Sequence, residues 1–270
     1  MNELLEKAIE AHGGIGRWKK AVGVTVDLSI GGVLFESKGQ DVDGESACSY
    51  ARNHVGLFRV ADDGCWNGRS RLLRRVELEA DLRNQRVLMR HLGTSDLTAI
   101  FTPERVTIEA SGGKQVGTLE RPREALIALD DQAPWELSHA AYFCGYAMWT
   151  YLTQPFLYCY PGGEVEEIEP WEEDGELLRR LKVRFPDTIT THTREQISYF
   201  GKDGLLRRHD YAVDVLHGAQ GANYPYDYRD CDGFQMPRRR LVYPLGSDNR
   251  RVPEPILVSI DIGNVKFRFG

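Results

Sequence analysis

The 270-residue sequence lacks most features that would assign a protein directly to a functional class. Its formal charge of −6 and pI near 5.7 leave no basic excess, which argues against a nucleic-acid-binding face. The first residues contain neither the basic nor the apolar region of a secretory leader. The five cysteines form no C-x-x-C pair: Cys48, Cys65, Cys144, Cys159 and Cys231. These absences predict reduced thiols and a soluble, cytoplasmic protein.

Motifs for metal, phosphate and nucleophile chemistry are also missing. The seven histidines never stand at the H-x-H, H-x-x-x-H or H-E-x-x-H spacings that bring two ligands to one metal. No G-x-S-x-G elbow occurs. The glycine-rich segment 13–16 lacks the Lys-Ser/Thr of a phosphate-binding loop and fits the end of a helix. We therefore expect no metal and no cofactor; metal ligands distant in sequence are the remaining alternative.

What the sequence does contain is one long run without charge. No Asp, Glu, Lys or Arg occurs between Glu136 and Glu164, whereas charged and apolar residues alternate almost everywhere else. Pro134 suits the first turn of a helix, and Pro155 suits its end. We predict a central helix over residues 134–154. Because this helix is apolar on all sides, it must be enclosed on all sides.

A membrane-spanning helix is the alternative for this run. Such a helix needs about 20 predominantly apolar residues. The run is interrupted by small and polar residues, namely Ser138, His139, Gly145, Thr150, Thr153 and Gln154, and the chain has no second candidate. We therefore predict a buried helix and no integral membrane segment.

The rest of the chain is typical of an antiparallel sheet preceded by a short amphipathic helix at residues 2–12. Five Asp-Gly dipeptides separate β-like segments, a strong indication of hairpins: Asp43-Gly44, Asp63-Gly64, Asp174-Gly175, Asp203-Gly204 and Asp232-Gly233. Segments 22–30, 33–42, 47–60 and 65–76 are predicted as strands. Segment 77–92 is ambiguous, and helix is weakly favoured. From residue 164 to the C-terminus, strands resume.

No linker divides the chain, so we predict one domain over residues 1–270. Its fold class is α+β, mostly β. A sheet of ten or so strands tends to curl, and the strands alternate apolar and polar side chains, which leaves one face dry. The prediction is therefore a large, curved antiparallel sheet, a half-barrel, wrapped around the central apolar helix.

This arrangement of elements resembles the half-barrel fold of lipoprotein carriers of the LolA and LolB type. The chain also resembles a family of uncharacterised bacterial proteins of similar length. The matching segments are 11–14, 141–149, 155–156, 165–171, 207–211 and 253–261. The resemblance implies a hydrophobic interior. A fold of this kind hosts at least one cofactor-independent enzyme, in pigment biosynthesis, which is an analogy of fold alone.

Candidate binding residues follow from the aromatic side chains of the predicted helix. Tyrosine and tryptophan, with polar tips on apolar bodies, are common in cavities for lipophilic ligands. The candidate ligand-binding residues are Trp135, His139, Tyr142, Tyr146, Trp149 and Tyr151. The competing interpretation is that this aromatic stripe is ordinary core. His139 is either a core histidine with a backbone partner or a polar contact or general acid/base inside a cavity.

Two groups of arginines are candidates for binding an acidic head group. Arg83, Arg86 and Arg90 form one cluster, and segment 238–240 forms another; solvated faces are the alternative for both. His209 and Tyr211 are expected on one face of a strand and Asp210 on the other, which excludes a local relay among the three. The acidic segment 164–174 is expected to be an exposed, charge-protected edge.

Three functions remain open. The first is binding of a lipophilic small molecule in the cleft between sheet and helix. The second is a cofactor-independent enzyme acting on a hydrophobic metabolite, with the candidate catalytic residue His139, or a basic residue, as the acid/base. The third is an interaction or structural protein with a filled core. A cavity of roughly 300 Å³ or more favours a ligand, and convergent titrating groups with perturbed pKa values favour an enzyme. No nucleic-acid partner is expected.

Overall fold

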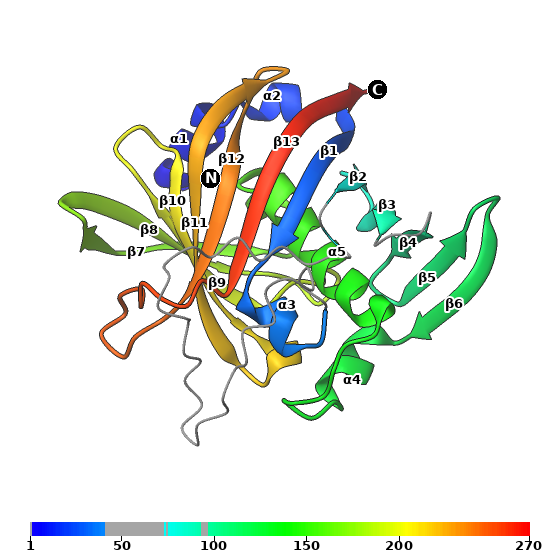
Figure 1. Cartoon of the computed structure of the whole chain (residues 1–270). Coiled ribbons are helices and arrows are strands. Elements are labelled where there is room, and N and C mark those ends of the chain that lie inside the picture. The colour runs from blue at the N-terminus through cyan, green and yellow to red at the C-terminus, as the bar shows by residue number, and fades with distance from the viewer. Residues whose placement is uncertain (1, 41–72, 74, 93–96) are drawn as a thin grey trace.

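The computed structural model describes residues 2–40, 73, 75–92 and 97–270 (Figure 1). In this part of the chain, thirteen strands form one antiparallel sheet. The strands are β1 (Ala21–Gly31), β2 (Val76–Asp81), β3 (Arg86–Leu92), β4 (Leu97–Phe101), β5 (Arg105–Ala110), β6 (Lys114–Glu120), β7 (Glu164–Glu173), β8 (Glu176–Arg184), β9 (Glu195–Phe200), β10 (Leu206–Val213), β11 (Ala219–Cys231), β12 (Phe234–Pro244) and β13 (Val258–Phe269). The sheet is not closed, because β6 and β7 are its two edges.

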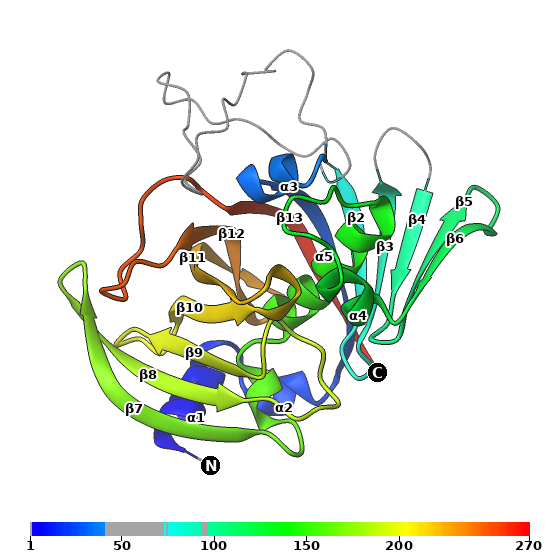
Figure 2. The same cartoon turned by 90° about the horizontal axis from the view of Figure 1, so that it is seen from below.

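The helices are α1 (Glu3–Ala11), α2 (Ile15–Trp18), α3 (Val33–Ser37), α4 (Pro122–Ile127) and α5 (Leu137–Thr153), with 3₁₀ turns η2 (Phe156–Cys159) and η3 (Asp214–Leu216). From β1 the chain steps outward to the edge strand β6, and from the other edge, β7, it steps back to β13, which pairs with β1. α5 joins the two edges. It therefore crosses the hollow of the curved sheet, which wraps around it (Figure 2).

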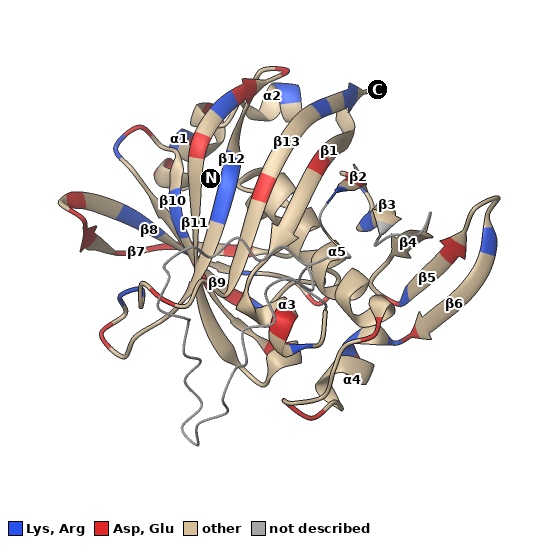
Figure 3. Ribbon diagram, in the orientation of Figure 1, with Lys and Arg blue, Asp and Glu red and all other residues tan. Residues whose placement is uncertain are grey.

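α5 is enclosed as its composition requires. Sixteen of its seventeen residues are buried, and it carries no charged side chain (Figure 3). The helix begins at Leu137, three residues later than the predicted Pro134, because Glu136 caps it: the Glu136 carboxylate and the His139 ring bond each other's backbone N–H groups. Within the described residues, no helix has the length and apolarity needed to cross a membrane.

Short helices cover the two ends of the half-barrel. At the C-terminal end of α5, the ring of Trp18, the last residue of α2, stacks on Phe156, with centroids 4.3 Å apart. At the N-terminal end, Phe35 of α3 contacts Trp135 and Phe143 edge to face. The predicted N-terminal helix is confirmed as α1, whose first N–H groups are accepted by the Asn2 side chain. α5 is thus surrounded by the sheet along its length and by helices at both ends.

Two segments differ from their predicted structure. Residues 33–37 form α3 and not a returning strand, because β1 already pairs with β13 on one side and β2 on the other. Gly32 allows the turn into α3: its φ is 124°, and a Cβ there would lie 2.2 Å from the Leu257 carbonyl oxygen. Segment 77–92, weakly predicted as helix, is the β2–β3 hairpin, whose turn is held by the Asp81 carboxylate. The strands predicted at 47–60 and over most of 65–76 lie outside the described residues.

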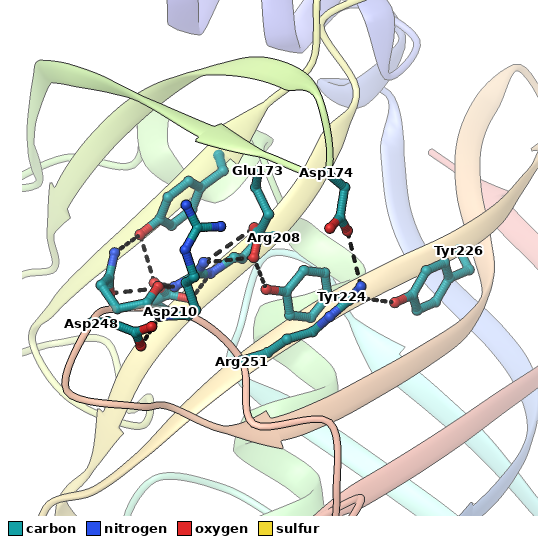
Figure 4. A network of polar contacts seen from close by, with 11 residues as sticks. Glu173, Asp174, Arg208, Asp210, Tyr224, Tyr226, Asp248 and Arg251 are labelled. Carbon is teal, nitrogen blue, oxygen red and sulfur yellow. Dashed lines mark hydrogen bonds and ion pairs between the residues drawn. The ribbon is translucent and has the colours of Figure 1, made fainter.

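The outer face of β7–β12 carries a buried ionic network (Figure 4). Arg208, which is fully buried, donates to the carboxylates of Glu173 and Asp210 and to the backbone oxygen of Asn249. Arg251 donates to Asp174 at 2.9 Å. Asn249 and Arg251 belong to the segment after β12, so the network holds this segment against the sheet. The predicted acidic edge is β7, where the glutamates at 166 and 167 pair with cations of β8.

Candidate functional site

An apolar pocket lies between α5 and the inner face of the sheet. Its walls come from β1, α3, α5, β10 and β13 and are formed by Ile30, Phe35, Phe143, Cys144, Ala147, Met148, Tyr151, Tyr211, Val258 and Ile260. The cavity volume is about 20 Å³, room for about one water molecule. The side chains around this pocket therefore nearly fill it, and a larger ligand must displace some of them.

The pocket ends on hydrogen-bonded tyrosines. The hydroxyls of Tyr151 and Tyr211 lie 2.6 Å apart, and the Tyr151 hydroxyl lies 2.8 Å from Nε2 of His192. The His192 ring stacks on Tyr211, with centroids 3.9 Å apart and planes inclined by 7°. Nδ1 of His192 is 3.3 Å from the Tyr146 hydroxyl. One end of an otherwise apolar pocket is thus able to donate and accept hydrogen bonds.

Behind these tyrosines lies an interior polar cluster, formed by Gln154, His209, Asn223 and Arg240. His209 and Asn223 are directly opposite each other on β10 and β11, and Gln154 at the end of α5 is 3.0 Å from Nδ1 of His209. All four side chains are buried. Three of their atoms have no hydrogen-bond partner among the described residues: Gln154 Oε1, Asn223 Nδ2 and Arg240 Nε. Buried polar atoms without a partner are rare and call for a ligand, an ion or water.

Arg240 is the only formally charged member of this cluster. Its guanidinium lies 4.8 Å from the centroid of the Tyr151 ring and donates to the Tyr151 carbonyl oxygen at 3.2 Å and to Asn223 Oδ1 at 3.4 Å. Among the described residues it pairs with no carboxylate. Burial lowers the pKa of Arg240, but a guanidinium keeps its proton in proteins. An unbalanced positive charge therefore lies in the interior.

The titrating groups near the pocket are neutral at neutral pH. Burial raises the pKa of Tyr151 to about 12 and also raises the pKa of Tyr211. Burial, aided by the nearby positive charge of Arg123, lowers the pKa of His192 to about 3. Burial also lowers the pKa of His209 well below its ordinary value. No anion of the described residues in this region balances Arg240.

The structure separates the predicted ligand-binding residues. Tyr151 lines the pocket, and Tyr146 lies behind it, where its ring contacts Phe143 edge to face and its hydroxyl is 3.3 Å from His192. Trp149 donates its indole N–H to the Asp81 carbonyl oxygen at 2.7 Å, which ties α5 to β2. Tyr142 packs against the ring of Phe101 on β4, and Trp135 packs against α3. These last three side chains are placed as core and anchoring residues outside the pocket.

His139 does not line the pocket. Its Nδ1 accepts the Glu136 backbone N–H at 3.1 Å, so the ring caps the helix that it begins. Burial lowers the pKa of His139, against the opposing effect of the Glu136 charge. A helix-capping role accounts for these contacts, and it corresponds to the interpretation of His139 as a core histidine with a backbone partner.

The arginines proposed for a head group also lie away from the pocket. Arg83 and Arg86 are exposed near the β2–β3 turn, and Arg90 pairs with Glu77 at 2.6 Å. In contrast, Arg240, which belongs to the second arginine segment, is buried inside. The alternation on β12 contains this signal: Arg240 has the same parity as Met236 and Val242, both buried and apolar. No comparable pattern in the sequence points to His192, which lies between β8 and β9.

No family model and no curated protein matches this chain. Solved structures that resemble it include a LolA superfamily protein from Nitrosomonas europaea (9% identity, TM-score 0.49, covering 98% of this chain and 92% of that one). Another is an outer membrane lipoprotein-sorting protein domain from Vibrio parahaemolyticus (7% identity, TM-score 0.46, covering 99% of this chain and 92% of that one). A third is a DUF1329 family protein from Desulfovibrio piger (11% identity, TM-score 0.42, covering 99% of this chain and 92% of that one).

These comparisons bear on two sequence-based predictions. The predicted LolA-like fold, a curved antiparallel sheet wrapped around a helix, is confirmed. The predicted cytoplasmic location is wrong on this comparison, since the similar structures include a protein domain of outer membrane lipoprotein sorting. The chain has the LolA-like fold.

Proposed function

We propose that the protein binds a lipophilic small molecule in the apolar pocket between α5 and the inner face of the sheet. The observation that carries this proposal is the lining of the pocket, which is apolar or aromatic and uncharged throughout. Two tyrosine hydroxyls at its end offer the few polar contacts that orient a ligand in such sites. The apolar part of the ligand would lie along Met148 and Ile260.

Binding requires the pocket to enlarge, and two features supply the means. Met148 has an unbranched thioether side chain that adapts its shape to its surroundings. α3, which covers the pocket with Phe35, has only five residues and is joined to the segment before β13 by the N–H groups of Val33 and Leu34, at 3.2 and 3.1 Å. Displacement of α3 by the ligand would open the pocket at the N-terminal end of α5.

We favour binding over catalysis because of the protonation states inside the pocket. Tyr151, with its pKa raised to about 12, and His192, with its pKa lowered to about 3, are both neutral at neutral pH. A general acid or base works best with a pKa near the operating pH. These groups therefore suit hydrogen bonding to a ligand better than proton transfer.

Dye binding tests this function. The full chain is titrated with the hydrophobic fluorophore N-phenyl-1-naphthylamine, and lipophilic molecules are then used to displace it. Ala147→Leu adds a bulky group to the pocket wall and is expected to weaken dye binding by about tenfold or more. Ala128→Leu makes the same change at an exposed position and is the control. Absence of dye binding, or equal binding by both variants, would show that the core is simply filled.

A further inference from the structure

The interior polar cluster presents two buried N–H donors that reach no described acceptor at full hydrogen-bond geometry. The Asn223 side chain does lie close enough to the Tyr151 and Tyr211 hydroxyls to oppose the rise in their pKa values that burial causes. Arg240 Nε and Asn223 Nδ2 are both buried and unpartnered. They belong to one place, because Arg240 Nη1 already contacts Asn223 Oδ1 at 3.4 Å. The side chains of Asn223 and Arg240 are 0% and 2% exposed. Two donors, one of them cationic, therefore lie on contacting side chains in a part of the interior that solvent does not reach.

A buried cation is costly unless an anion balances it. Among the described residues, Arg208 is buried to the same extent and illustrates the contrast: on the outer face, it pairs with the carboxylates of Glu173 and Asp210. Around Arg240 the described structure offers tyrosine rings, an amide and a carbonyl oxygen in place of a carboxylate. No carboxylate within the part of the chain that the structure describes completes this site, so we look for the negative charge in a bound molecule.

We propose that the interior polar cluster binds the carboxylate of the lipophilic ligand, with Arg240 Nε and Asn223 Nδ2 as its donors. This inference rests on the proposed function and specifies the ligand class as a long-chain carboxylic acid. One carboxylate has the single negative charge that balances one arginine. A phosphate monoester, with a charge nearer −2 at neutral pH, would leave a net negative charge in the low-dielectric interior.

The pocket and the cluster are joined in a way that suits such a molecule. Tyr151 lines the pocket and also carries Arg240 over its ring. Ile260 lines the pocket and is the strand partner of Arg240, directly opposite it on β13. An acyl chain in the apolar pocket would therefore contact Tyr151, and the Arg240 guanidinium lies over the ring of that same residue.

Binding measurements on matched ligands test the proposal. The full chain is titrated by calorimetry with hexadecanoic acid, with its methyl ester and with sodium propionate, which supplies the carboxylate with almost no chain. The acid is expected to bind about tenfold or more tightly than the ester, as a charge-assisted hydrogen bond predicts. Arg240→Met is expected to remove this preference, and Arg239→Met, at the exposed neighbour, is expected to retain it.

Asn223→Asp is a second variant that reports on the charge without any ligand. The new carboxylate lies where Arg240 already makes a contact, so it is expected to raise the melting temperature and to abolish the preference for the acid. A lowered melting temperature would mean that Arg240 is already balanced, which overturns the inference. This variant separates a failure of the anion site from a failure of the pocket.

The comparison of the three ligands also distinguishes the proposed carboxylate site from the proposed binding of a lipophilic molecule. Equal affinity for acid and ester refutes the carboxylate site and leaves lipophile binding standing. Propionate binding that depends on Arg240, with no added affinity from the long chain, supports the anion site and refutes the proposed function. Failure of all three ligands to bind refutes both.

Discussion

Buried neutral histidines should make the protein sensitive to acid, and His192 is the clearest case. Its ring is fully enclosed by Tyr146, Tyr151 and Tyr211, and the charged group that faces it is Arg123, a cation. Burial and this cation lower the pKa of His192 from 6.5 to about 3. As the pH falls, His192 is therefore protonated in the unfolded chain several pH units before it is protonated in the folded chain.

The sign and size of the effect follow from proton linkage. A histidine with a depressed pKa stabilises the folded state above pH 6.5, and this stability is lost as the pH falls toward 3. At pH 4, about 2.5 units below the ordinary pKa, the loss from His192 comes to about 3 kcal/mol. His12, with a pKa lowered to about 4, and His209 act in the same direction.

Urea unfolding at pH 7, 5.5 and 4 measures this loss. His192→Gln removes the titration and retains a donor and an acceptor for the two tyrosine hydroxyls. The fall in unfolding free energy between pH 7 and pH 4 is expected to be about 3 kcal/mol smaller in this variant than in the parent chain. His217→Gln, at a side chain that is 43% exposed, is the control and should retain the full loss. An equal pH dependence in His192→Gln and the parent would refute the reasoning.

Two further predictions concern stability. Arg208→Met leaves the buried carboxylates of its network without their cation and should destabilise the fold by about 3–5 kcal/mol. The control, Arg179→Met, removes a half-exposed ion pair and should lower the unfolding free energy by about 1 kcal/mol or less. Equal losses of the two variants in urea unfolding would contradict this reasoning. Gly145→Ala places a Cβ 2.4 Å from Cγ of Phe101 and should destabilise by about 1–3 kcal/mol, although alanine favours helix. Gly16→Ala, with nothing within 4 Å, is its control and should show no loss in the same assay.

The parts of the fold that depend on neighbouring residues were predictable from the sequence. Asp174-Gly175 and Asp232-Gly233 form hairpin turns with positive φ at both residues, a conformation that this dipeptide tolerates better than most. The charge-free run predicted the buried helix α5, since a helix without a polar face has to be enclosed. Pro155 marked its end. The curved sheet around one helix followed from these local signals.

The candidate site was only partly predictable. Tyr151 was among the predicted residues and lines the pocket, but the helix periodicity could not tell it from Trp149, which anchors α5 to β2. His139 had the chemistry of a site residue but caps its own helix. A helix that is enclosed all round presents every face to some part of the sheet, so its sequence alone does not indicate which face borders a pocket.

The sequence by itself determined that this chain forms an antiparallel sheet of hairpins around a charge-free helix, because turn chemistry and burial of apolar surface are local or compositional properties. Only the tertiary structure decided that β1 pairs with β13, that residues 33–37 become α3, and that Arg240 lies unbalanced beside Asn223 and Tyr151. These outcomes depend on pairing between strands distant in sequence. Such pairing decides which side chains meet in the interior and which charges find a partner there.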